Sequence, residues 1–334
     1  MDPLTHLLTS YTVARAARAR MASPEMATVV FAGMAPDMDW LWHLPEPLSP
    51  LRAYGTVTHS LAGAAVLAIA IGGSAWLAWR KRPSAASLPW LLAAAFLSTA
   101  VHVLLDLCAN PGIELYWPFR VARVSWNIAS SFDAILIAIL SVCALLPVIF
   151  GLVTEEIGAH KDPRPPRGWP VTALVLALLY FGVRGTLHAR AELLLREAEY
   201  GGKSPIHWAA FASGSSPFTW HGVVETETFL EEVEVPVGTG RAFAPESGTL
   251  QYKPEPSSVL DAAAATRIAH AYMRLARFPL LTLETTGAGT RAELRELGDS
   301  VLRDRHGAWR AVMDLDAQSK VTHEELRYDA ARSR

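Results

Sequence analysis

Charged side chains are scarce in this sequence, and they are unevenly placed. They make up 19% of the 334 residues, whereas hydrophobic residues make up 51% and the mean hydropathy is +0.20. A typical soluble domain carries about 25% charged residues. Of the 62 charged side chains, 33 lie in residues 200–334. The first 199 residues therefore favour a membrane domain, and the last 135 have the composition of an ordinary soluble domain.

Other absences exclude whole classes of protein. The net charge is −2 with no basic patch, which argues against a nucleic-acid partner. Only two cysteines, Cys108 and Cys143, are present, too few for a disulfide framework or a zinc ribbon. The first arginines follow the first apolar residues, the reverse of the order in a cleavable signal peptide. No Gly-x-Ser-x-Gly, P-loop or His-Glu-x-x-His motif occurs.

Four apolar runs are long enough to be considered as bilayer spans, which need about 20 residues. They cover residues 60–79, 88–108, 132–153 and 170–195, and Arg184 interrupts the last of them. Tryptophans flank the runs, as they do at membrane interfaces. The alternative is four buried helices of a large soluble core. The runs predict a mainly α-helical fold, in which residues 1–199 form a membrane bundle of about four spans.

The flanking segments carry weaker signals. Residues 4–19 read as a helix capped by Asp2, with Pro3 in its first turn. Beyond residue 200 the pattern predicts one helix over 256–277 and extended segments at 223–237, 250–253, 279–285 and 309–315. Residues 200–334 are therefore predicted to form a smaller α+β soluble domain.

A few polar side chains lie inside or beside the apolar runs, and almost all are histidine or aspartate. They are His6, Asp37, Asp39, His59, His102, Asp106, Asn110 and Asp133. If each run spans the membrane, the start of the first, the end of the second and the start of the third reach the same face. His102 and Asp106 are also four residues apart, on one side of a helix.

Ionisable groups near a membrane segment are costly and usually functional. Histidine and carboxylate without thiolate suit zinc, manganese or iron(II). Each residue also has a structural explanation, such as a hydrogen-bonded core histidine, a turn at Asp37–Asp39 or a helix cap at Asp133. A purely structural bundle does not need so many of these groups at one end, so the set together predicts a metal site.

The order of short motifs resembles a known family. The motifs are Met1–His6 (MDPLTH), Ala35–Trp40 (APDMDW), Thr58–Ser60 (THS), His102–Asp106 (HVLLD), Asn110, Trp117–Phe119 (WPF) and Asn127 to Asp133. Together they cover roughly residues 1–150 and resemble the bacterial inner-membrane, metal-dependent hydrolases of the YdjM type, also described as LexA-binding. The family often has a basic, glycine-containing stretch just before Thr-His-Ser, whereas Arg52 here lies further away.

The resemblance implies a membrane-bound hydrolase in the bacterial inner membrane. Its divalent ion, with zinc expected first and manganese or iron as alternatives, would be held by His6, Asp37, Asp39, His59, His102 and Asp106. Water activated by the metal would attack an ester or phosphoester. Asp39 or Asp133 would act as general base, and Asn110 would orient the substrate. A site at the membrane surface favours a lipid or lipid-linked substrate.

Two other functions are compatible with the sequence. The chain could be a non-catalytic metal-binding regulator or scaffold that acts on a protein partner through its C-terminal domain. It could also be a transporter that relays protons or ions, but the opposite end of the runs has few polar residues.

The dense charges Arg80–Arg82, with Lys161, Arg164 and Arg167, weakly favour a cytoplasmic location for the loops opposite the site.

Overall fold

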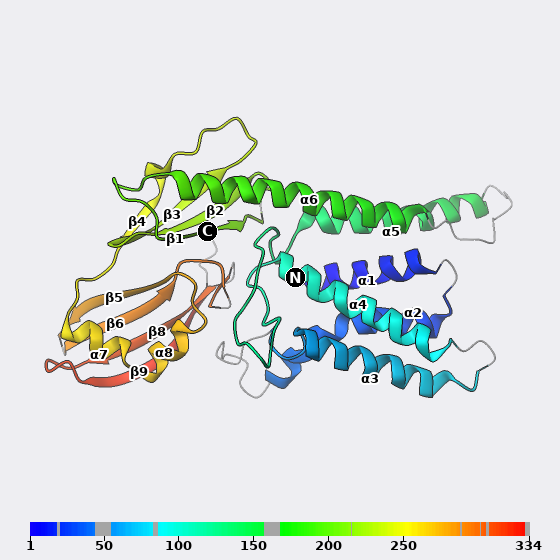
Figure 1. Ribbon diagram of the computed structural model, residues 1–334, viewed down its shortest axis with the longest axis horizontal. Helices are drawn as coiled ribbons and strands as arrows, with labels where there is room; N and C mark the ends of the chain where they lie inside the picture. The colour runs from blue at the N-terminus through cyan, green and yellow to red at the C-terminus, as the bar shows by residue number, and fades with distance from the viewer. Residues whose placement is uncertain are drawn as a thin grey trace. The chain divides into compact units, whose positions relative to one another are not determined.

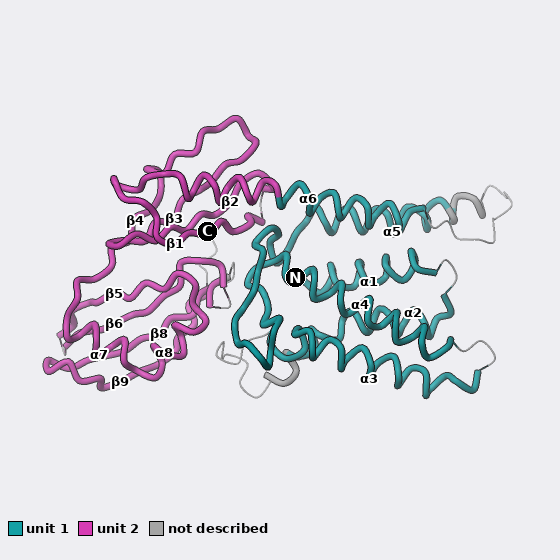
Figure 2. Tube along the Cα trace, in the orientation of Figure 1, with its two compact units in different colours: residues 1–44, 55–185 teal, residues 45–54, 186–334 magenta. Residues whose placement is uncertain are grey.

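A computed structural model describes residues 1–18, 21–43, 55–82, 86–156, 168–214, 216–287, 289–300, 302–304 and 307–330. Arg52, Lys161, Arg164 and Arg167, which the sequence singled out, lie outside these residues. The chain divides into two compact units (Figure 2). Unit 1 holds residues 1–44 and 55–185, and unit 2 contains the chain from Thr186 onward.

Unit 1 is helical (Figure 1). Its elements are α1 (Pro3–Ala17), α2 (Ser23–Met34), the 3-10 helix η1 (Ala35–His43), α3 (Leu61–Trp79), α4 (Leu88–Cys108), α5 (Ala134–Glu156) and the first part of α6 (Gly168–Glu197). Helix α1 begins as predicted, because the Asp2 side chain accepts a hydrogen bond from the backbone N–H of Thr5 at 3.0 Å.

Small residues allow the helices of unit 1 to approach closely. A Cβ atom on Gly33 of α2 would lie 1.9 Å from Ser10 Oγ of α1 and 2.6 Å from Ser98 Oγ of α4. A Cβ atom on Gly72 of α3 would lie 3.1 Å from the backbone oxygen of Leu91 in α4. Such small-residue contacts are typical of packed membrane helices.

Three described helices, α3, α4 and α6, are long and apolar enough to cross a membrane. Helix α5 has a shorter apolar stretch, Ala134–Phe150, and contains Pro147. The structure therefore supports the predicted membrane bundle, and the number of four spans stays a prediction. Arg184 does not break the fourth run: it is 1% exposed within α6, and its Nε donates a hydrogen bond to the backbone oxygen of Ile128 at 2.8 Å.

The segment between α4 and α5 is fixed to the beginnings of other helices of unit 1. Ser131 accepts a backbone hydrogen bond from Asp2 at 2.8 Å, and Leu115 accepts one from Leu61 at 3.0 Å. The Glu114 N–H donates to the Gly55 backbone oxygen at 2.9 Å. These bonds hold the ends of α1, α3 and α4 together at the end of the unit that carries the histidines and aspartates.

Unit 2 contains two antiparallel sheets. The first has the order β1-β2-β3-β4, with strands His207–Ala212, Thr219–Glu225, Phe229–Pro236 and Thr249–Tyr252. The second has the order β5-β6-β8-β7, with β9 also paired to β8. Its strands are Pro279–Thr286 (β5), Gly289–Glu296 (β6), Arg303–Asp304 (β7), Gly307–Leu315 (β8) and Val321–Ala330 (β9). A short 3-10 turn, η3 (Pro245–Ser247), precedes β4.

Helices cover both sheets of unit 2. Ala191 and Leu195, near the end of α6, are fully buried in the core of the first sheet, where Gly222 leaves room for Leu195. Helices α7 (Ser258–Ala264) and α8 (Arg267–Met273) pack on the second sheet.

The single helix predicted over residues 256–277 is therefore wrong. The Thr266 side chain accepts the N–H of Ala269 and starts α8 as a separate helix.

Candidate metal centre

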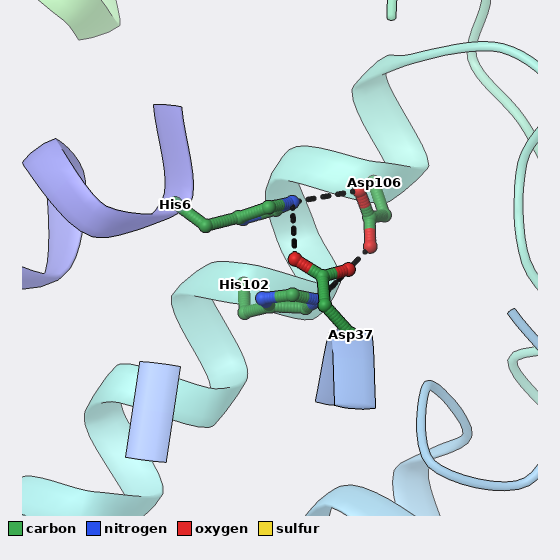
Figure 3. A group of neighbouring side chains, drawn as sticks. All are labelled: His6, Asp37, His102 and Asp106. Atoms are coloured by element: carbon green, nitrogen blue, oxygen red, sulfur yellow. Dashed lines mark hydrogen bonds and ion pairs between the residues drawn. The ribbon is translucent and has the colours of Figure 1, made fainter. Parts of the chain in front are cut away.

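Four side chains of unit 1 converge on one point (Figure 3). His6 comes from α1, Asp37 from η1, and His102 and Asp106 from successive turns of α4. One ligand atom from each residue lies within 4.8 Å of the others, and all four residues are buried. Segments distant in the sequence thus supply two imidazoles and two carboxylates to one small volume.

Asp106 lies between the two histidines of this four-residue group. Its Oδ1 is 3.1 Å from His6 Nε2, and its Oδ2 is 3.1 Å from His102 Nε2. Asp37 closes the group, with Oδ1 3.6 Å from His102 Nε2 and Oδ2 4.0 Å from His6 Nε2. The N-terminal ammonium group of Met1 also donates to Asp106 Oδ1.

The orientation of His102 is set by the backbone of α2. Its Nδ1 lies 2.7 Å from the backbone oxygen of Gly33. A carbonyl oxygen can only accept, so Nδ1 is the donor and Nε2 is the nitrogen that faces the two carboxylates. A histidine ligand whose other nitrogen donates to a carbonyl is the usual arrangement in metal sites. The glycine at position 33 permits this approach of α2 to α4, since Ser98 Oγ would lie 2.6 Å from a Cβ there.

His59 borders the four-residue group from the start of α3. Its Nε2 is 3.3 Å from Asp106 Oδ2 and 3.5 Å from Asp37 Oδ1. Its Nδ1 is 3.5 Å from Asp39 Oδ2 and 3.1 Å from Thr58 Oγ1. Asp39 therefore lies behind His59, on the side away from the four-residue group. The Asp39 carboxylate also accepts the Gly55 N–H at 3.1 Å.

The pKa values of His6 and His59, which lie outside the apolar helices, are shifted in opposite directions. Burial, with His102 nearby, lowers the pKa of His6 to about 4. Burial also opposes the charged form of His59, but the close carboxylates of Asp106, Asp37 and Asp39 outweigh it and raise that pKa to about 10. Three buried carboxylates thus make the centre favourable for a cation.

The donor atoms fit a divalent metal ion. Among the described residues, His102 Nε2 and Asp106 Oδ2 are buried and make no hydrogen bond, although they lie 3.1 Å apart. Buried polar atoms almost always have a partner, and this convergent pair has the geometry to hold a cation between them. Two imidazole nitrogens with two carboxylates match the ligand preferences of zinc, manganese and iron(II).

The remaining candidates from the sequence lie outside the four-residue group. Asp133 caps α5: its Oδ1 accepts the Leu136 N–H at 3.1 Å, and its Oδ2 accepts the Tyr180 hydroxyl at 2.7 Å. The Asn110 side chain accepts a hydrogen bond from Ser125 Oγ at 3.4 Å. Both residues are buried. Their catalytic roles, like those of Asp39, stay predictions.

Sequence reasoning missed two parts of this arrangement. The carbonyl of Gly33 carries no side-chain signal, so its bond to His102 could not be read from the sequence. The bond from Tyr180 to Asp133 could have been suspected, because Arg184 in the same apolar run marks α6 as a helix with a buried polar side.

Comparison with known proteins identifies the family. The family model described as YdjM inner membrane protein matches residues 1–191, which include all four residues of the group and His59. No curated protein and no solved structure matches the chain. The match and the three apolar helices indicate a membrane protein in a lipid bilayer. Because the matched residues are more than half of the sequence, the chain belongs to the YdjM inner membrane protein family.

Proposed function

We propose that the chain is a multi-pass, membrane-bound, metal-dependent hydrolase of esters or phosphoesters. The observation that carries the proposal is the convergence of His6, Asp37, His102 and Asp106 within 4.8 Å in a buried position. Only part of the group is paired internally, by the hydrogen bond of 3.1 Å between His6 Nε2 and Asp106 Oδ1. Here His102 Nε2 and Asp106 Oδ2 face each other without a hydrogen bond.

The four-residue group would hold the ion, with His59 Nε2 as a further ligand and zinc as the first candidate. A divalent ion there would polarise a substrate oxygen and lower the pKa of water. Asp39, against Nδ1 of His59, would orient that imidazole or take a proton through it. Asp133 is the alternative general base, and Asn110 is proposed to orient the substrate.

The substrate is proposed to be a lipid or a lipid-linked ester. Helix α4 is apolar enough to span a bilayer, and His102 and Asp106 lie in its last two turns. The end of a spanning helix lies near the headgroup layer, where the ester and phosphoester bonds of lipids are found. The assay therefore includes both lipid and water-soluble esters.

The first test is the metal content of the detergent-purified protein, measured by elemental analysis. We expect stoichiometric zinc, manganese or iron in the wild type. The metal should be lost in Asp106→Asn and His102→Ala and retained in His323→Ala, which changes a histidine whose side chain is 59% exposed in unit 2. A wild type without metal after reconstitution would overturn the proposal.

Hydrolysis is tested next, with aryl esters, aryl phosphodiesters and phospholipids. We expect turnover of at least one class, abolished by a chelator and restored by the metal found in the first test. Bound metal without turnover of any class would instead favour a metal-binding regulator or scaffold acting through unit 2.

A further inference from the structure

A second polar site lies in unit 1, at the ends of its helices opposite the metal ligands. A cavity of about 110 Å³ is lined by the start of α2, the end of α3 and the start of α4. Of the proposed metal ligands, Asp37 follows the end of α2 and His59 precedes α3. His102 and Asp106 lie in the last two turns of α4. This cavity is therefore separate from the centre described above and is not explained by the proposed hydrolysis.

The charge at the cavity is positive. Arg80 and Arg82 line it, together with the carboxylate of Glu25. The Glu25 side chain is only 8% exposed, and both of its oxygens accept hydrogen bonds from Arg18, at 3.1 and 3.3 Å. Its negative charge is thus compensated by Arg18, and Arg80 and Arg82 are left to attract an anion.

The helix ends beside the cavity add to this positive charge. Ala22, the residue before α2, lines the cavity, and Ser87 stands before α4. Neither residue provides a side-chain hydrogen bond to cap its helix. The first-turn amides of a helix carry partial positive charge and favour anions.

The residues that line the cavity are typical of a membrane interface. Trp76, Trp79 and Leu91 line it, and the guanidinium of Arg80 lies 5.2 Å above the Trp76 ring. Tryptophan and arginine at the end of a spanning helix lie at the level of the lipid headgroups. An occupant of this cavity would meet cationic groups and apolar rings together.

We propose that this cavity binds the phosphate headgroup of an anionic phospholipid. Arg80 and Arg82 would contact the phosphate oxygens, and the indoles of Trp76 and Trp79 would pack against the glycerol and the first acyl carbons. Basic pockets between membrane helices are recurrent sites for anionic headgroups. A bound lipid would join α2, α3 and α4 at this end of unit 1 and stabilise the folded protein.

Thermal unfolding of the full-length protein in detergent tests the proposal, with phosphatidylglycerol, phosphatidylcholine or inorganic phosphate added in separate titrations. We expect phosphatidylglycerol to raise the unfolding temperature by several degrees and the other two to leave it unchanged. The variant Arg80→Gln/Arg82→Gln should need at least tenfold more phosphatidylglycerol for half of that rise. Arg196→Gln, which removes an exposed arginine near the end of α6, should behave like the wild type.

Three results would overturn the proposal. An equal response of the double variant would show that the arginines are not the site. An equal rise with phosphatidylcholine would show a general lipid effect. A rise with inorganic phosphate alone would identify a site for a free anion instead of a lipid. If the double variant loses its cooperative transition, Arg82→Gln alone, which changes a residue outside α3, provides the same comparison.

Discussion

The imidazole rings of His6 and His102 stack with their centroids 3.7 Å apart and their planes 19° from parallel. Two protonated rings would repel each other at this distance, and burial with His102 nearby already lowers the pKa of His6 to about 4. The stack is therefore compatible with a neutral His6 ring, and the Nε2 atoms of both histidines reach Asp106. Neutral imidazole is the form that binds a metal.

Removal of the metal should destabilise unit 1. A ligand that binds only the folded state stabilises it by about 4 kcal/mol when present at 1,000 times its dissociation constant. We expect a chelator to lower the unfolding temperature of the wild type, and added zinc or manganese to restore it. Asp106→Asn should show no response to either addition. An identical chelator effect in that variant would show that the metal binds elsewhere.

Gly33→Ala should weaken metal binding without touching a ligand. The new methyl group would overlap Ser10 Oγ, push α2 away from α1 and α4, and lengthen the bond from His102 to the Gly33 carbonyl. Loss of such an outer hydrogen bond typically costs about 10- to 100-fold in metal affinity. Competition with a fluorescent chelator measures this. Gly73→Ala, with open space around the added Cβ, is the matched control and should bind as the wild type does.

Asp39→Asn and Asp133→Asn distinguish the two proposed general bases. If Asp39 orients His59, its variant should lower both metal affinity and turnover, because the amide cannot replace the carboxylate facing Nδ1. If Asp133 is the base, its variant should lower turnover and leave metal content unchanged. Full turnover in both variants would exclude both residues as the base.

Tyr180→Phe should destabilise unit 1. The variant removes the hydroxyl that donates to the buried carboxylate of Asp133 at 2.7 Å. A buried charged acceptor that loses a donor costs about 1–3 kcal/mol. Thermal unfolding in one detergent measures the change. Tyr116→Phe, at a residue that is 46% exposed, is the control and should unfold at the wild-type temperature.

The sequence predicted the local features of the site well and its geometry only in part. The spacing of His102 and Asp106 correctly placed both on one side of α4, and Asp2 with Pro3 correctly marked the start of α1. The two aspartates of Asp37-x-Asp39 could not be assigned from spacing. They lie in a 3-10 helix, where about three residues make a turn, so residues two apart point to different sides.

Composition and packing divide the chain at different places. Composition changes near residue 200, but the compact units separate at residue 185, inside α6. The charged residues become frequent where helix α6 ends. Ala191 and Leu195 lie before that point but pack in the core of the first sheet, which they cover. A composition change of this kind marks where the chain passes from lipid to water. The boundary between two packed cores need not lie at the same residue.

Helix α6 is longer than a bilayer requires. Its 30 residues extend about 45 Å, and the hydrocarbon layer takes about 30 Å, or about 20 residues. About ten residues are left over, and Ala191 and Leu195, which complete the core of the first sheet, lie near that end. A truncated chain that ends at residue 191 would lose Leu195, and a soluble fragment that starts at residue 200 would lack both residues. A soluble fragment of unit 2 should therefore fold only if it keeps the end of α6, from Thr186 to Glu197.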